Sequence, residues 1–122
     1  MQHSLLVSFI NGEITPKEFD IEIKQEVDAC EEGIRSKAKV GHIIITDGPQ
    51  TIVTRDHMRR LLQYLLDESV PWTSLNYTAD CLMMSDDFEP EDEKAAEAIE
   101  FLSDDSRPPS PAETCGALEA LR

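Results

Sequence analysis

Two segments of the sequence share one helix-start signal, which constrains the fold more than any other feature. Thr15-Pro16-Lys17-Glu18 and Ser110-Pro111-Ala112-Glu113 each place a hydroxyl residue, then proline, then glutamate three positions after the hydroxyl. The hydroxyl can accept a hydrogen bond from the backbone N–H of the glutamate, and the glutamate can bond back to the cap. Proline suits the first helical position. These signals predict helices that begin at Pro16 and Pro111.

Apolar residues recur every three to four positions after these and other start points, which predicts amphipathic helices. We expect six of them, near residues 4–10, 16–33, 55–66, 75–83, 90–102 and 111–121. The expected caps of the first, third, fourth and fifth helices are Ser4, Thr54, Thr73 or Ser74, and Glu89 or a residue slightly before it. The most regular stripe is expected at the centre of the core. It consists of Met58, Leu61, Leu62, Leu65 and Leu66.

The other predicted buried faces follow from the same spacing. Cys81 is expected to lie off the apolar stripe of its helix, whereas Cys115 is expected to lie on the stripe of the last helix. The expected stripes are Phe19, Ile23, Val27, Cys30 and Ile34, then Leu75, Ala79, Leu82 and Met83, then Ala95, Ala98, Ile99 and Leu102, and last Cys115, Leu118 and Leu121.

Residues 40–54 have a different pattern. Two β-branched runs, 40–46 and 51–54, flank the turn sequence Asp47-Gly48-Pro49-Gln50, which predicts a short β-hairpin packed on the helices. The alternative is an extended loop whose isoleucines enter the core. The expected fold class is therefore mainly α: one compact domain over residues 1–122, with five to six helices and one hairpin at most.

The charge of the chain excludes several kinds of partner. Among 122 residues there are 25 Asp and Glu against 11 Lys and Arg, a net charge of −14. Nucleic acids and anionic membrane surfaces attract basic surfaces, so neither is expected as a direct partner. There is neither a run of about 18 apolar residues nor a basic, signal-like N-terminus. The expectation is a cytoplasmic protein.

No motif for cofactor, metal or catalytic chemistry stands out. The cysteines, Cys30, Cys81 and Cys115, are odd in number and widely separated, which favours reduced core thiols. No Cys/His spacing suits zinc, and the acidic stretch after residue 86 has no glycine at the place a calcium loop needs one. His57 is interpreted as a surface or capping residue. We expect no metal, no cofactor and no catalytic residues.

The densest charge lies in residues 86–105, with ten acids and one base, Lys94. One interpretation is a solvated helix face that only aids solubility. The other is a docking surface for a basic protein, which would speed encounter and be sensitive to salt. The candidate binding residues are Asp86, Asp87, Glu89, Glu91, Asp92, Glu93 and Glu97, with Trp72 and Tyr77 as aromatic anchors.

Basic residues gather between positions 35 and 60, so charge is unevenly distributed along the chain. We favour intramolecular pairing of these residues with the acidic helices, and the alternative is an anion-binding patch. For Trp72, and equally for Tyr64, a core role competes with an interface role. The basic residues are Arg35, Lys37, Lys39, Arg55, Arg59 and Arg60.

Three segments together resemble a known group of proteins: LLVSFINGEITPKEFD, TRDHMRRLLQYLLDESV and LNYTADCLMMSDDFEPEDEKAAEAIEFLSDD. They are similar to the small acidic bacterial immunity proteins of contact-dependent inhibition and bacteriocin-type toxin systems. The resemblance implies a cytoplasmic protein that binds one toxin, often a basic nuclease, and blocks its active site. It carries no defined inhibitory residues onto this chain.

The leading hypothesis is therefore a non-enzymatic, toxin-neutralising immunity protein whose carboxylates replace phosphates over a basic cleft. The second is a helical adaptor or homodimeric regulatory protein in which the acids only confer solubility. A third, a small hydrolase that uses His57 with Asp56 or Asp80, has no supporting motif.

Overall fold

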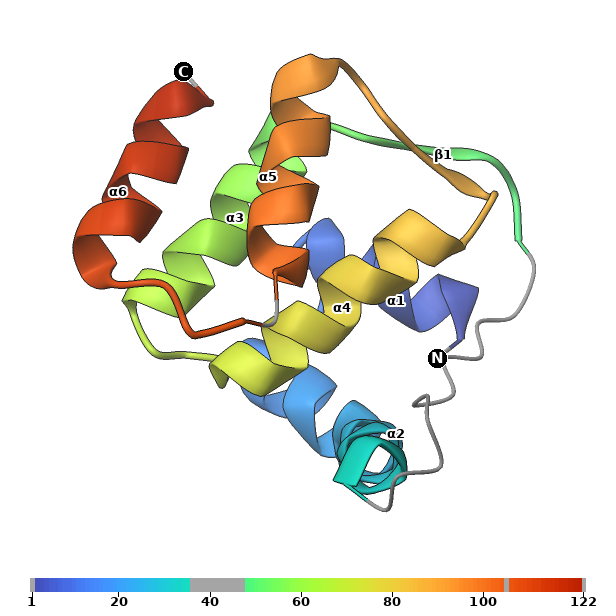
Figure 1. The fold of residues 1–122 in the computed structure, drawn as a ribbon. Coiled ribbons are helices and arrows are strands. Elements are labelled where there is room, and N and C mark those ends of the chain that lie inside the picture. The colour runs from blue at the N-terminus through green and yellow to red at the C-terminus, as the bar shows by residue number, and fades with distance from the viewer. Residues whose placement is uncertain (1, 36–47, 105, 122) are drawn as a thin grey trace.

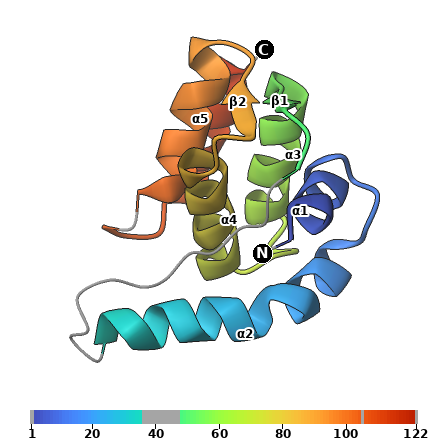
Figure 2. The same cartoon turned by 90° about the vertical axis from the view of Figure 1, so that its right-hand side faces the viewer.

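The computed structural model describes residues 2–35, 48–104 and 106–121. These residues form six helices and a two-stranded parallel sheet, so the fold is mainly helical, as predicted (Figure 1). Helix α2 lies across one end of the other helices (Figure 2). The elements, in chain order, are α1 (His3–Ile10), α2 (Pro16–Arg35), β1 (Thr51–Val53), α3 (Arg55–Leu66), α4 (Trp72–Met84), β2 (Phe88–Pro90), α5 (Glu93–Ser103) and α6 (Pro111–Ala120).

The predicted caps of α2, α3 and α6 are confirmed. Thr15 Oγ1 accepts from the Glu18 N–H at 3.1 Å, and Thr54 accepts from the His57 N–H at 3.1 Å. Ser110 and Glu113 bond reciprocally, at 3.2 Å and 3.0 Å, in a complete capping box. Each side chain satisfies a backbone N–H that the first turn of a helix leaves without a partner.

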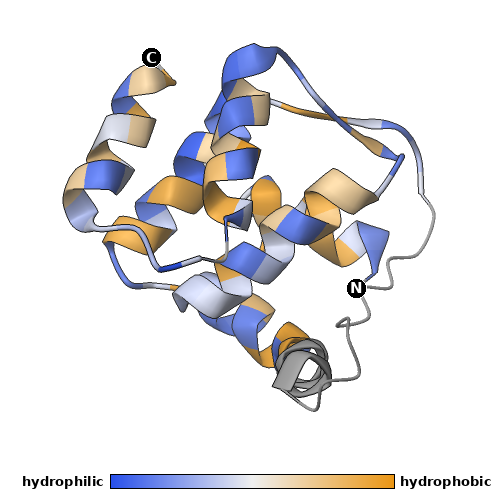
Figure 3. Cartoon of the chain, viewed as in Figure 1, coloured by the Kyte–Doolittle hydropathy of each residue, from blue (hydrophilic) through white to orange (hydrophobic). Residues whose placement is uncertain are grey.

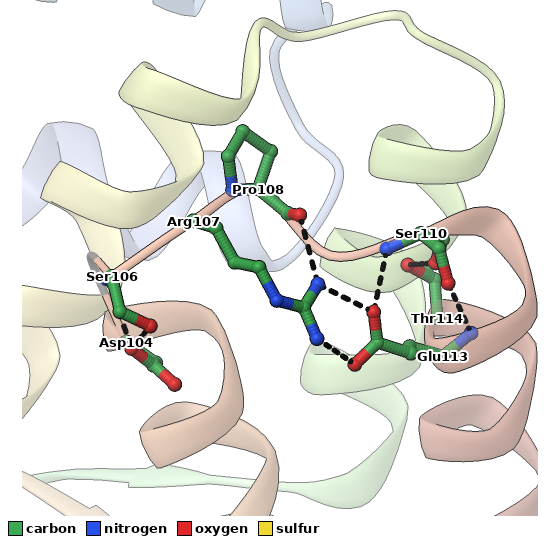
Figure 4. Close-up of polar contacts among 7 residues, drawn as sticks. All are labelled: Asp104, Ser106, Arg107, Pro108, Ser110, Glu113 and Thr114. Carbon is green, nitrogen blue, oxygen red and sulfur yellow. Dashed lines mark hydrogen bonds and ion pairs between the residues drawn. The ribbon is translucent and has the colours of Figure 1, made fainter.

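Arg107 strengthens the start of α6. Its guanidinium donates to both carboxylate oxygens of Glu113, at 2.7 Å and 2.8 Å (Figure 4). These bonds and the Ser110 N–H lower the pKa of Glu113 from 4.5 to about 2. The linker between α5 and α6 is thus tied to the capping box that begins α6.

Three predicted helix starts are wrong. Helix α1 begins at His3 without a side-chain cap, not behind Ser4. Helix α4 begins at Trp72, directly after Pro71, and not behind a cap at Thr73 or Ser74. Helix α5 begins at Glu93 because Asp92, not a residue before Pro90, accepts from the Ala95 N–H at 3.0 Å.

The predicted hairpin over 40–54 is also wrong, and the sheet is parallel. Strand β1 pairs in parallel with β2, with Ile52 in register with Glu89 and Val53 with Pro90. Its predicted hairpin partner, 40–46, lies outside the described residues. The pairing segment, Phe88–Pro90, carries a proline and a glutamate and follows two aspartates, so its local composition argues against a strand. Pro90 is tolerated because β2 forms one edge of the sheet.

Most of the predicted stripes are buried. Phe9 and Phe19 stack with ring centroids 3.6 Å apart, which joins α1 to α2. Figure 3 shows hydrophobic and hydrophilic residues alternating along the helices, the pattern of one-sided burial. The described core includes Phe19, Ile23, Val27, Met58, Leu61, Leu62, Leu75, Ala79, Leu82, Ala95, Ala98, Ile99 and Leu102, while Leu65 is half-buried.

Two helical faces differ from the prediction. In α4, Cys81 is fully buried and Met83 is 54% exposed, because α2, α5 and β2 surround this helix and shift its buried arc. In α6, Cys115 is exposed and Thr114 is buried in its place. In the described residues, no helix is both long enough and apolar enough to span a bilayer.

Candidate protein-binding surface

The acidic segment, residues 86–93, lies where α4 ends and β2 pairs with β1. Ser85 ends α4, and its hydroxyl accepts from the Asp87 N–H at 3.2 Å, which turns the chain into β2. The Thr51 N–H donates to the Asp87 carbonyl at 2.8 Å. The parallel pairing therefore places the acidic segment beside the start of α3, although about 35 residues separate them in the chain.

Three of the predicted binding carboxylates are occupied by contacts within the fold. Asp87 Oδ2 accepts from the Gly48 N–H at 3.0 Å, and Glu91 Oε2 accepts from the Arg55 N–H at 3.0 Å. Asp92 caps α5 and also accepts from Arg55 Nε at 2.7 Å. These groups hold β2 and α5 against β1 and α3.

The contact between Arg55 and Asp92 is an ion pair as well as a hydrogen bond. Arg55 Nη2 lies 2.7 Å from Asp92 Oδ2, and both side chains are about one-third exposed. The guanidinium lowers the pKa of Asp92, with a further contribution from the Ala95 N–H. The carboxylate in turn raises the pKa of Arg55. A charge-assisted pair of this geometry favours the ionised form of both groups.

The other four predicted carboxylates point into solvent. They are exposed, and none has a hydrogen bond or ion pair with any residue that the structure describes. One follows the end of α4, one lies on β2, and the other two lie on α5. They are Asp86, Glu89, Glu93 and Glu97, and we call them the exposed acids.

The basic stretch is largely used within the molecule. Arg55 pairs with Asp92, Arg59 Nη1 lies 3.2 Å from Asp56 on the same helix, and Arg60 donates to the Ile10 carbonyl at the end of α1. The predicted pairing with the acidic helices is therefore confirmed for Arg55. The Arg35 side chain, Lys37 and Lys39 lie outside the described residues. Basic and acidic residues that are far apart in the sequence, such as Arg55 and Asp92, thus partly neutralise each other in the folded chain.

The predicted aromatic anchors do not join this surface. Tyr77 is 4% exposed and belongs to the core. Trp72 starts α4, about 20 Å from the acidic end of this 13-residue helix at 1.5 Å per residue. Tyr64 is half-buried against Phe9, with ring centroids 5.5 Å apart. The aromatic side chains proposed from sequence therefore serve packing or lie at a distance from the exposed acids.

Trp72 instead borders a groove between α3, the start of α4 and the linker before α6. The groove encloses about 370 Å³ and is lined by Pro108, Pro109 and Pro111 among others. The indole Nε1 is buried, and no acceptor for it occurs among the described residues. The lining also includes the carboxylate of Glu68 and the hydroxyl of Thr114, which donates to the Ser110 carbonyl at 3.0 Å.

His57 is a capping residue, as expected. Its Nδ1 accepts from the Thr54 N–H at 3.0 Å, and its Nε2 lies 2.7 Å from Asn11 Oδ1. The neutral tautomer with the proton on Nε2 satisfies both contacts. Burial lowers the pKa of His57, the positive charge of Arg60 lowers it further, and Asp56 and Glu91 oppose the shift.

Sequence reasoning missed the exposed apolar residues around the acidic segment. Ile52, Met83 and Met84 are 48%, 54% and 64% exposed. They lie on β1 and on the last turn of α4, the two elements that flank the segment. The adjacent Met83-Met84 pair directly before an acidic run was a visible signal, but spacing had placed Met83 in the core.

The described residues contain no group of three or more His, Cys, Asp and Glu side chains arranged to hold a metal ion. No protein-family model, curated protein or solved structure matches the chain.

Proposed function

We propose that the chain is a toxin-neutralising immunity protein that binds a cognate basic protein, such as a nuclease, and blocks its active site. The observation that carries the proposal is the set of exposed acids on one stretch of chain, none of which forms an ion pair with a described residue. The resemblance of the sequence to small acidic immunity proteins names the class of partner. Carboxylates presented this way can replace substrate phosphates in a basic cleft.

Rigid support makes these acids suitable for binding. Neighbouring carboxylates hold the segment to β1 and α3, so the exposed acids are presented without a large ordering cost on association. Ile52 and Met84 supply apolar area beside them. Close charge pairs at interfaces of this kind can be coupled by about 1.5–7 kcal/mol.

The test is binding to the product of the neighbouring gene. The triple variant Asp86→Asn/Glu89→Gln/Glu97→Gln is expected to bind this product more weakly, with a slower association rate and less dependence on salt. The matched control is Glu13→Gln/Glu18→Gln/Glu22→Gln, which removes three exposed charges elsewhere. If the wild-type chain fails to bind this product even at low salt, or if the two triple variants lose affinity equally, the proposal is wrong.

The second candidate is a homodimeric adaptor. Exposed Met83 and Met84, adjacent at the end of α4, favour it, because large apolar side chains at a surface mark contact sites when they cluster. Analytical ultracentrifugation distinguishes the two candidates. A dimer that persists in both low and high salt supports the adaptor, whereas a monomer supports the inhibitor.

A further inference from the structure

Strand β1 pairs with β2 along one edge, and its other edge, here called the open edge, has no strand partner among the residues that the structure describes. The Thr51 N–H donates to the Asp87 carbonyl, and the Val53 carbonyl accepts from the Glu91 N–H, both at 2.8 Å. In a parallel ladder, alternate residues direct both backbone groups to the same neighbour. The N–H and C=O of Ile52 therefore point away from β2, and no hydrogen bond of either group to a described residue occurs.

The opposite edge of the sheet is closed to another strand. Pro90 has no N–H to donate, and the Phe88 N–H is directed to the Ser85 carbonyl at 3.4 Å. The Phe88 ring also stacks on His3, with centroids 4.7 Å apart. Within the described residues, a strand can add to this sheet at β1 only.

No described residue gives the open edge the usual protection against strand addition. Natural edges carry lysine or proline, or are covered, whereas the centre of β1 is Ile52 with its side chain 48% exposed. Its register partner across the ladder is the exposed Glu89, and Asp86 precedes β2. A positively charged strand matches these acids. A second copy of this chain, at −14, is repelled by them.

We propose that an extended, basic segment of the partner protein adds to β1 as a third strand. Its backbone pairs with the N–H and C=O of Ile52. Its Lys or Arg side chains lie on the face that Ile52 shares with Glu89, where their aliphatic stems cover Ile52 and their charges face Glu89. Backbone bonds supply affinity in this mode of recognition, and the flanking side chains supply specificity. The inference rests on the proposed function, because it names how the basic partner is held.

The probe is a synthetic ten-residue peptide of alternating valine and lysine, added to the full chain at low salt. Amide hydrogen exchange is measured at Ile52, and the control peptide alternates valine and glutamate. We expect the lysine peptide to slow exchange at Ile52 by about tenfold and the glutamate peptide to leave it unchanged. No slowing at Ile52, or equal slowing by both peptides, overturns the inference.

Two variants test the same inference at exposed side chains, where a substitution removes no buried packing and the fold is expected to be kept. Ile52→Lys places a positive charge on the edge and is expected to weaken binding of the lysine peptide by about tenfold. Ile21→Lys makes the same change on α2, where the side chain is 65% exposed, and is expected to bind as the wild type does. Equal binding by the two variants overturns the inference.

The product of the neighbouring gene separates the two proposals. If it binds the wild type and Ile52→Lys equally, strand addition is wrong and the inhibitory function stands. If it does not bind the wild type, the proposed function fails whatever the peptides do.

Discussion

The Arg55 side chain at the start of α3 contacts Asp92, the residue that caps α5, with Nε and Nη2 both 2.7 Å from Oδ2. One carboxylate therefore begins one helix and fixes the start of another. The contact also makes part of the acidic segment a structural element of the fold. The acidic segment is thus divided between structural acids, such as Asp92, and exposed acids, such as Glu89.

Replacing Asp92 with alanine is expected to lower Tm by several degrees. The substitution removes both the cap of α5 and the partner of Arg55. Asp92→Asn keeps a capping oxygen but no charge, so its Tm should lie between those of Asp92→Ala and the wild type. Thermal denaturation followed by circular dichroism measures both variants. Equal Tm values for Asp92→Ala and the wild type would contradict the structural role.

Gly48 is expected to tolerate no side chain. A Cβ at this position would lie 2.3 Å from the ring of the buried His3, while the Gly48 N–H holds Asp87. Gly48→Ala should therefore lower the free energy of unfolding by about 1–3 kcal/mol, the usual cost of overpacking. Urea denaturation measures the change.

Gly116 provides the matched control for this substitution. It lies within α6, and a Cβ there meets no atom within 4 Å. Gly116→Ala should stabilise the protein by about 0.5–1 kcal/mol, because alanine is the better helix former. Destabilisation by both alanine substitutions to the same extent would argue against steric conflict at Gly48.

Stability is expected to fall as pH decreases from about 6.5, the ordinary pKa of histidine. Because the pKa of His57 is lowered in the folded state, the unfolded chain binds the proton more readily in this window. Protonation of Nδ1 also removes the acceptor for the Thr54 N–H. Tm measured from pH 7 to pH 5 should decline, and His57→Gln should flatten that decline. An identical slope in the variant would assign the effect to other groups.

A separate loss is expected at lower pH from Glu113. Its folded pKa of about 2 lies below the ordinary 4.5, so its contribution is present above pH 4.5 and disappears as pH falls toward 2. Arg107→Gln removes the guanidinium that lowers this pKa. The variant should therefore lose less stability between pH 5 and pH 3 than the wild type. A loss equal to that of the wild type would contradict this assignment.

Local signals predicted the starts of α2, α3 and α6, but not that of α5, where Asp92 is one of several neighbouring acids that could act as the cap. The capping residues Thr15, Thr54 and Ser110 act within three positions of themselves, so sequence alone determines their contacts. The pairing of Phe88–Pro90 with β1 depends instead on segments that are distant in the chain, and its residues disfavour a strand. The exposure of Cys115 likewise depends on how α6 lies against α3 and α5, which periodicity within α6 does not determine.

The location of the candidate site could be predicted from the sequence, but the roles of its individual acids could not. Its location in the acidic segment followed from composition, but composition does not distinguish Asp92, held by Arg55, from Glu89, which faces solvent. The basic residue that makes the difference is 37 positions away. The parallel pairing of β1 with β2 and the contact between α3 and α5 bring the two charges together.

The exposed acids are expected to be dispensable for folding. Asp86→Asn/Glu89→Gln/Glu97→Gln removes three charges that have no partner among the described residues, in a chain that carries −14. Its free energy of unfolding should lie within about 0.5 kcal/mol of the wild type, or above it where repulsion is relieved. Urea denaturation at low salt measures it, with Asp92→Ala as the destabilised reference. A loss as large as that of Asp92→Ala would mean that these carboxylates support the fold, and a loss of partner binding in the triple variant could then no longer be assigned to the surface.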